Sequence, residues 1–280
     1  MSSWLLLLLL LALLLRPPPL TLAEESREVA PSETAVVVYD VWDAHWCGPA
    51  SERASLLAGR VDAALRRWRR RGIGLVAMAP NGVAPAAAAG PARQRALRCS
   101  VDAAANGDVG NGTGSALHLA PPLDASRWVP PVASDPLHTC EAPGMAPARR
   151  VWLRQHPSIV VEASDRSPDV WTTDRAELAC LLRRRGIRRV LLVGVHANLC
   201  MLWIHPLSLA WLLANQAPLG LTSLAVVSDL SDSISDGTAP GGPQAAHAKV
   251  LDWVNATLGV PAFHSRVCLP AEEGPLGTLH

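Results

Sequence analysis

The residues best suited to chemistry lie in the stretch RRVLLVGVHANLC, Arg188 to Cys200. Its apolar run, Val190 to Val193, has the length of a buried parallel strand and is followed by Gly194. A cysteine placed between such a strand and a following helix lies at the carboxyl edge of the sheet, where α/β folds bind ligands. The amides and dipole of that helix favour a thiolate. Cys200 is therefore predicted to be an activated nucleophile.

A carboxylate follows the first expected strand, Thr34 to Tyr39, directly. Asp40 would lie at the same sheet edge as Cys200, where it could take the thiol proton and later activate water. A turn cap is the other interpretation of Asp40. Asp43 and His45, two residues apart, could offer a carboxylate and an imidazole to a metal, but we expect hydrogen bonding instead. No metal and no other cofactor is predicted.

Two tryptophans belong to the same stretch, DVWDAHWC. Trp42 and Trp46 could form an aromatic wall against a flat substrate, or they could cover the sheet edge. With Asp43 and His45 they make up the predicted substrate pocket. His196, within the loop that ends at Cys200, is expected to line this pocket as well.

Strand-like and helical segments alternate along the rest of the chain. Repeated strand–helix units predict a three-layer α/β/α fold, Rossmann-like, with a central and mainly parallel sheet. No second domain and no internal repeat is found; an insert at about 80–147, rich in Gly, Pro and Ala, has no clear period. We expect strands over Thr34–Tyr39, Gly72–Ala79, His156–Glu162, Arg189–Val193, Leu221–Ser228 and Ala262–Val267, and helices over Ser51–Arg71, Thr173–Arg185 (with Thr173 as N-cap), Leu199–Ala214 and Ala245–Leu258.

Composition excludes several classes of protein. The chain has 280 residues, 49% of them hydrophobic and 18% charged, so a sizeable core is expected and overall disorder is not. The net charge of +1 argues against a nucleic-acid partner. The arginine clusters at 66–71 and 183–189 end helical patterns, where cations complement the helix dipole.

The first residues predict a targeting segment. Leu5 to Leu15 is an apolar run too short to span a bilayer comfortably, and prolines 17–19 break it. Small residues at Thr21 and Ala23 suit cleavage, so residues 1–23 are predicted to be a signal peptide, with an uncleaved signal anchor as the alternative. Residues 24–280 would then form the mature protein, which we expect to be secreted or in the lumen of the secretory pathway, with no membrane contact.

The cysteines are six, and no pair has CxxC spacing, which argues against a redox-active thiol protein. In an oxidising compartment some should pair. Cys99 and Cys140 bracket the loop-rich insert and are the predicted disulfide. Cys200 must stay free to act as nucleophile, and one further cysteine would then remain unpaired.

Four segments together resemble the isochorismatase-like cysteine hydrolases: DVWDAHWC after the first strand, RQHPSIVV in the middle, GVHANLC after the fourth strand and DLSD after the fifth. The resemblance is to the subgroup with a WDxHWC box and a GVHTNMC-like motif, and it extends from about Val36 to the C-terminal strand. It implies a three-layer α/β/α fold and hydrolysis of small amides or related C–N bonds, or of vinyl ethers. It also implies a small-molecule substrate and, since relatives commonly form dimers or tetramers, a homo-oligomer.

The resemblance also implies residue roles. Cys200 matches the family nucleophile and Asp40 the catalytic aspartate. A cis peptide bond is implied at Val195–His196, with the amides of His196 and Cys200 forming an oxyanion hole.

The third family residue is a lysine on the strand expected at 159–162, and this chain has none there. Glu162 or a neighbour occupies that region, and a glutamate cannot stabilise a thiolate as an ammonium does. Arg166 is a nearby cation. Two hypotheses follow: a cysteine-dependent hydrolase, or a catalytically impaired relative that serves as a ligand-binding or assembly module.

Overall fold

The computed structural model describes residues 29–82, 90–105, 119–124, 128, 130, 152–235 and 240–269. The predicted signal peptide, Cys140 and much of the insert lie outside these residues. Among the described helices, none combines the length and the apolar character needed to cross a bilayer.

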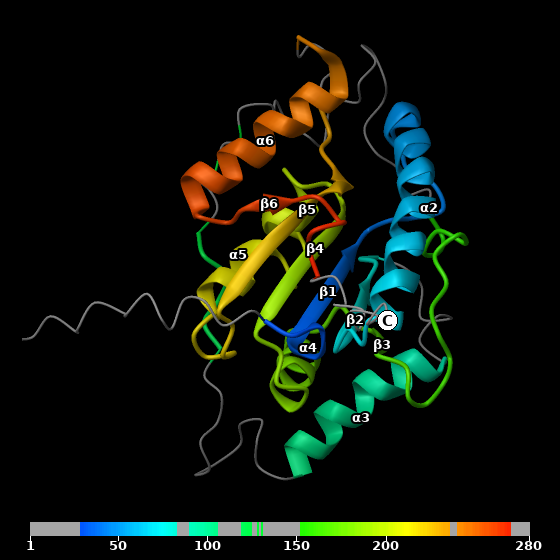
Figure 1. Cartoon of the computed structure of the whole chain (residues 1–280), viewed down its shortest axis with the longest axis vertical. Helices are drawn as coiled ribbons and strands as arrows, with labels where there is room; N and C mark the ends of the chain where they lie inside the picture. The colour runs from blue at the N-terminus through cyan, green and yellow to red at the C-terminus, as the bar shows by residue number, and fades with distance from the viewer. Residues whose placement is uncertain are drawn as a thin grey trace, which may run out of the picture.

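Six strands form one sheet in the order β3-β2-β1-β4-β5-β6, and all neighbouring strands are parallel (Figure 1). β1 lies between β2 and β4, and its last residue, Tyr39, pairs with Ala79 on one side and Gly194 on the other. The three strands therefore end level, and the residues that follow them share one edge. The strands are β1 (Thr34–Tyr39), β2 (Leu75–Ala79), β3 (Asp169–Trp171), β4 (Arg189–Val195), β5 (Ser223–Asp232) and β6 (Ala262–Phe263).

Helices cover both faces of the sheet, which confirms the predicted three-layer fold (Figure 1). β1 is buried along its whole length, and its side chains alternate between two apolar clusters. Val36 and Val38 pack with α2 on one face, whereas Ala35, Val37 and Tyr39 pack with α4, α5 and α6 on the other. The helices are η1 (Pro31–Glu33), α2 (Gly48–Arg70), α3 (Pro91–Ala105), α4 (Arg175–Arg184), η3 (Cys200–Ile204), α5 (Leu209–Ala214) and α6 (Gly242–Leu258).

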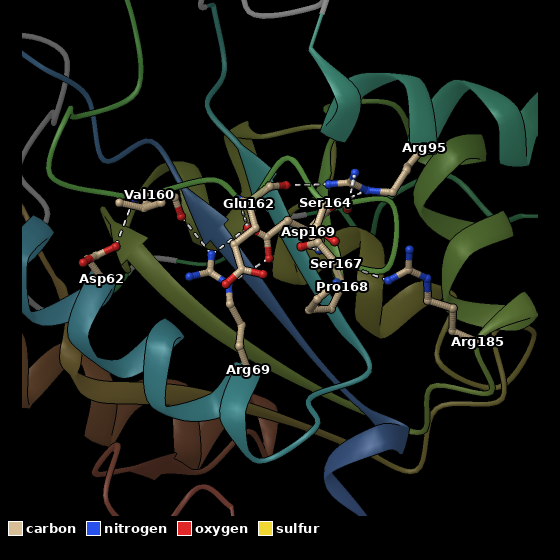
Figure 2. A network of polar contacts seen from close by, with 10 residues as sticks. All are labelled: Asp62, Arg69, Arg95, Val160, Glu162, Ser164, Ser167, Pro168, Asp169 and Arg185. Carbon is tan, nitrogen blue, oxygen red and sulfur yellow. Dashed lines mark hydrogen bonds and ion pairs between the residues drawn. The ribbon is translucent and has the colours of Figure 1, made fainter.

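The strand expected over His156–Glu162 is wrong, because the third strand is the short β3. Side chains, rather than a neighbouring strand, bind the backbone groups of Val160 and Glu162 (Figure 2). The Val160 amide donates to Asp62 Oδ1 at 2.9 Å, and Arg69 and Arg95 donate to the carbonyls of Val160 and Glu162. An apolar run with β propensity is thus held as a loop.

Two helix predictions also need correction. The helix expected over Leu199–Ala214 is divided into η3, a short π-helical turn, and α5. Pro206 lies between them and has no amide to donate, and the Leu207 amide bonds instead to His205 Nδ1 at 2.9 Å. The N-cap of α4 is Asp174 rather than Thr173, since Asp174 Oδ1 accepts the Glu177 amide.

The insert contains a helix that the sequence pattern did not indicate, α3. Cys99 on α3 forms a disulfide with Cys180 on α4, with 6.0 Å between the Cα atoms, so the predicted Cys99–Cys140 bond is wrong. The thiols of Cys200 and Cys268 are free, as predicted for Cys200 and for one further cysteine. Cys47 is also disulfide-bonded.

Candidate active site

Asp40 follows β1 in a left-handed backbone conformation, with φ of 46°, and is fully buried. The Asn81 amide, which follows β2, donates to Asp40 Oδ1 at 2.6 Å. Asp40 Oδ2 has no partner of standard hydrogen-bond geometry among the described residues. Burial raises the pKa of Asp40 to about 8, although the Asn81 amide and the Cys200 thiol, as hydrogen-bond donors, oppose the rise.

A glycine allows β4 to end beside Asp40. Gly194 has a φ of +112°, and a Cβ there would lie 2.0 Å from the Tyr39 carbonyl oxygen. Only glycine accepts both the conformation and the close approach of the two main chains. β4 therefore delivers the loop 195–200 directly to the end of β1.

Cys200 begins η3 at the end of this loop and is partly exposed. Three groups lie close enough to its sulfur to shift the pKa of the thiol: the Asp40 carboxyl, the His196 amide and the amide of Cys200 itself. None of them forms a hydrogen bond of standard geometry with the sulfur among the described residues. Burial raises the pKa of the thiol well above its ordinary value, the Asp40 charge raises it further, and the two amides lower it. The sequence-based expectation of a helix-stabilised thiolate is therefore wrong for this state, because burial and the neighbouring carboxylate outweigh the amides.

The loop is tied to the segment after β5. Asn198 Nδ2 donates to the Ile234 carbonyl at 2.7 Å, and the Ile234 amide donates to Asn198 Oδ1 at 3.1 Å. The Ala197 amide donates to the Asp232 carbonyl at 2.8 Å. The Val195–His196 peptide bond is cis, as the family resemblance implies. The hydrogen bonds of Ala197 and Asn198 hold the loop 195–200 against the segment after β5.

A histidine pair lies against the loop. His45 Nε2 and His196 Nε2 are 3.2 Å apart, and His45 Nδ1 accepts the Cys47 amide at 3.1 Å. Burial lowers the pKa of His45 to about 4. Burial, followed by the proximity of His45 and Arg53, lowers the pKa of His196 well below its ordinary value. Both rings are therefore neutral at pH 7.

The predicted pocket residues divide into two groups. Trp42 stacks on Trp152 at 4.0 Å between ring centroids and on His45 at 5.9 Å, and Trp46 lies 5.0 Å from His45. Trp42 Nε1 also donates to the Asn81 carbonyl. Trp42 and Trp46 therefore both contact the His45 ring, and Trp42 also binds Asn81, the residue whose amide donates to Asp40.

Asp43, by contrast, is not directed at the thiol. Its Oδ1 accepts the amides of Leu153 and Arg154, and its Oδ2 lies 3.5 Å from Arg154 Nε. Asp43 thus holds the segment that pairs with 41–43, which agrees with the expected hydrogen-bonding role. Within the described part of the chain, no group of three or more His, Cys, Asp and Glu side chains could hold a metal ion.

Neither residue considered for the place of the family lysine accompanies Cys200. Glu162 contacts Arg69, and its amide bonds to Asp169, the first residue of β3, at the opposite edge of the sheet. Arg166 is exposed on the same loop. Among the described groups that shift the pKa of Asp40 or Cys200, none is a cationic side chain.

Gln155 is the residue of this region that approaches the site. It forms an isolated antiparallel bridge with Trp42 and is 6% exposed, and neither atom of its amide group has a partner among the described residues. Sequence reasoning missed Gln155, Asn81 and Asn198. Asn81 carried a usable signal, because it directly follows the end of a strand in the same way as Asp40.

Comparisons with known proteins find similarity at the level of structure. No protein-family model matches the chain, and no curated protein does either. The chain is similar to a cysteine hydrolase from Pseudomonas syringae pv. phaseolicola 1448A, with 15% identity and a TM-score of 0.41 over 86% of this chain and 95% of that one. It is also similar to an isochorismatase family protein from Burkholderia thailandensis, with 16% identity and a TM-score of 0.44 over 86% of this chain and 96% of that one.

Proposed function

We propose that this protein is a cysteine-dependent hydrolase that cleaves an amide-like C–N bond in a small molecule. One observation carries the proposal: the Asp40 carboxyl and the Cys200 thiol, far apart in the sequence, lie close enough together, where β1 and β4 end, for each group to shift the pKa of the other. Nucleophilic catalysis by a cysteine whose thiol is protonated needs a neighbouring base to take the proton, and a carboxylate can serve as that base. The resemblance of GVHANLC and DVWDAHWC to the isochorismatase-like hydrolases supports the same chemistry.

The reaction proceeds in two halves. The Asp40 carboxylate accepts the thiol proton as the Cys200 sulfur attacks the carbonyl carbon, and the carbonyl oxygen gains the electron pair. The tetrahedral intermediate collapses, the C–N bond breaks, and the amine leaves with the proton from Asp40. Water then gives a proton to Asp40 and attacks the thioester; the C–S bond breaks, the acid is released and the proton returns to sulfur.

The negative charge of each intermediate falls on the substrate oxygen. We assign the amides of His196 and Cys200, which lower the pKa of the thiol in the resting state, as the donors to that oxygen. Because burial raises both pKa values of the Asp40–Cys200 pair, the molecules that react at pH 7 are the minority in which Asp40 is ionised, and the negative charge moves from Asp40 to the substrate oxygen during the attack. The amides would then supply the stabilisation to which a lysine would otherwise contribute.

A second candidate function is a ligand-binding or assembly module without turnover. It is favoured by the raised pKa of the thiol and by the lack of a described cation acting on the pair. In either case we propose a secretory location and a small-molecule ligand. The Cys99–Cys180 disulfide supports an oxidising compartment.

A screen of small amides tests the choice between the two functions. Wild type, Cys200→Ala and Asp40→Asn would be compared for release of amine. A hydrolase gives turnover in the wild type that falls by about 1,000-fold or more in both variants. Turnover that survives Cys200→Ala contradicts the hydrolase. Amides that raise the melting temperature of the wild type without being cleaved support the second function.

A further inference from the structure

The proton positions in the histidine pair follow from its hydrogen bonds. His45 Nδ1 accepts the Cys47 amide, so this nitrogen carries no proton. Burial lowers the pKa of His45 to about 4, so the ring is neutral at pH 7 and its one proton lies on Nε2. His45 Nε2–H is therefore a donor, and the nitrogen that faces it, His196 Nε2 at 3.2 Å, is the acceptor.

The same reasoning places the proton of His196. The ring is neutral, since burial and the neighbouring His45, Arg53 and His247 all disfavour its charged form. With Nε2 accepting, the proton lies on Nδ1. His196 is 1% exposed, and its Nδ1 has no partner among the described residues. The chain of hydrogen bonds from the Cys47 amide thus ends in a buried N–H donor without a described acceptor.

We propose that His196 Nδ1–H is a substrate-positioning donor, which binds a neutral acceptor such as a carbonyl, ether oxygen or ring nitrogen close to the bond that is cleaved. This inference rests on the proposed hydrolase function and deepens it. Buried donors are nearly always paired, so His196 Nδ1–H needs an acceptor. His205 Nε2 also has no partner of standard geometry among the described residues, but the Ala79 carbonyl acts on it. His196 differs because its own main-chain amide is close enough to Cys200 to lower the pKa of the thiol, so we place a ligand acceptor there.

The assignment also limits what His196 can do. A general base needs a free lone pair, but His196 Nε2 is occupied and Nδ1 holds the proton. His196 therefore orients the substrate while Asp40 moves protons. The expected substrate carries a second acceptor besides the carbonyl that is attacked.

His205 provides an internal reference for the proton positions. It is fully buried, its Nδ1 accepts the Leu207 amide at 2.9 Å, and burial lowers its pKa to about 4. Its proton must lie on Nε2, as in His45. Nitrogen-15 NMR of the full chain distinguishes the two tautomers of each ring. We expect Nε2–H for His45 and His205 and Nδ1–H for His196, without protonation of any of the three between pH 6 and 8. An Nε2–H form of His196, or a charged ring in this range, overturns the proposal.

The second readout uses a covalent adduct and does not depend on turnover. Alkylation of Cys200 with iodoacetamide places an amide carbonyl beside the loop. We expect the resonance of the His196 Nδ1 proton to move downfield in the adduct, while that of His205 stays in place. An unchanged His196 resonance contradicts the donor role, whether or not the protein hydrolyses amides.

Kinetics on a cleaved amide then separates positioning from structural support. Asparagine places an N–H close to the position of Nδ1, whereas leucine offers no donor. For a substrate with a second acceptor, His196→Leu should lower kcat/KM by about tenfold to a hundredfold, and His196→Asn should restore most of it. For an analogue without that acceptor, the losses in both variants should be at least tenfold smaller than the loss of His196→Leu on the first substrate. The control His205→Asn should leave the ratio of kcat/KM for the two substrates unchanged. Equal losses on both substrates, or no rescue by asparagine, overturn the proposal.

Discussion

At the amino edge of the sheet, arginine side chains surround Asp169, whereas at the carboxyl edge Asp40 is buried with the Asn81 amide and the Cys200 thiol as its neighbours. Arg69 donates to both oxygens of Asp169, at 3.0 Å and 2.6 Å. Both aspartates are buried next to a strand end. Burial raises the pKa of both aspartates, but at Asp169 the Arg69 guanidinium opposes the rise, whereas no cationic side chain acts on Asp40 among the described residues.

The amino edge is built to hold a loop. Around Asp169, Arg95 donates to four backbone carbonyls and Arg185 donates to that of Pro168 (Figure 2). This cluster fixes residues 160–168, and through them the segment that brings Gln155 to Trp42. The arginine side chains at this edge satisfy the backbone carbonyl groups of a loop.

The carboxyl edge leaves Asp40 able to exchange a proton near neutral pH, since its pKa is raised to about 8. The arginines that hold the loop at the amino edge do not supply a positive charge to Asp40 or Cys200. The amino edge thus contributes to the stability of the fold, and the carboxyl edge holds the residues of the proposed reaction.

The largest expected effect comes from a glycine at each edge. A Cβ on Gly194 or on Gly74 would lie 2.0 Å from a carbonyl oxygen, of Tyr39 and of Ser32 respectively. Gly194 also has a φ of +112°. We expect Gly194→Ala to lower the free energy of unfolding by about 4 kcal/mol or more, and by more than Gly74→Ala. Urea titration measures both, and equal losses would mean that the backbone at the carboxyl edge is not strained.

Loss of the arginine at the amino edge should come next. Arg69→Met leaves Asp169 buried without its ion pair, which should cost about 3–5 kcal/mol of stability. The exposed Arg166→Met serves as the control, with little change expected. Activity per folded molecule should fall less than tenfold, because the cluster holds the loop and does not touch Cys200. A loss of activity as large as that in Cys200→Ala would show that the two edges are not separate.

Asp40→Asn should change stability in the opposite direction. The folded pKa of about 8 lies above the ordinary value of 3.8, so the stability associated with protonated Asp40 is complete below pH 4 and is lost as pH rises towards 8. Asparagine cannot ionise, so the variant does not lose this stability as the pH rises. Asparagine also tolerates the left-handed backbone at this position. We expect the variant to be roughly 1–4 kcal/mol more stable at pH 7 and to match the wild type at pH 3. Destabilisation at pH 7 would indicate that Asp40 is held as a carboxylate.

The smallest effect is expected for Glu162. Its side chain is 42% exposed and lies 3.7 Å from Arg69, which already binds Asp169. Glu162→Gln should change the free energy of unfolding by less than about 1 kcal/mol and leave kcat/KM unchanged. A strong kinetic effect would place Glu162 at the site, where its sequence position had suggested it.

Much of the carboxyl edge could be predicted from the sequence. β1 and β4 are continuous apolar runs, which buried parallel strands require, and the residues that follow them must share an edge. This rule places Asp40 near Cys200 without any knowledge of the loops. It could not give the pKa of the thiol, because burial depends on residues from several distant segments.

The amino edge could not be predicted in the same way. The run Ile159–Val161 has the composition of a strand, but side chains from α2 and α3, namely Asp62, Arg69 and Arg95, hold this region as a loop. β3 is short and begins with a charged residue, so it gives no periodic signal. The tautomer of His196 depends on the Cys47 amide, which is distant in the chain and invisible to any pattern.

The pH dependence of Cys200 alkylation tests the central claim, that Asp40 takes the thiol proton. Iodoacetamide would be reacted with the wild type and with Asp40→Asn from pH 6 to 10, with Cys268→Ala in both backgrounds to remove the other free thiol. The account predicts a rate that rises in the wild type with a midpoint near pH 8, where Asp40 becomes a carboxylate. In Asp40→Asn the rise should move above pH 9, because burial still raises the pKa of the thiol. The same midpoint in both proteins would contradict the account.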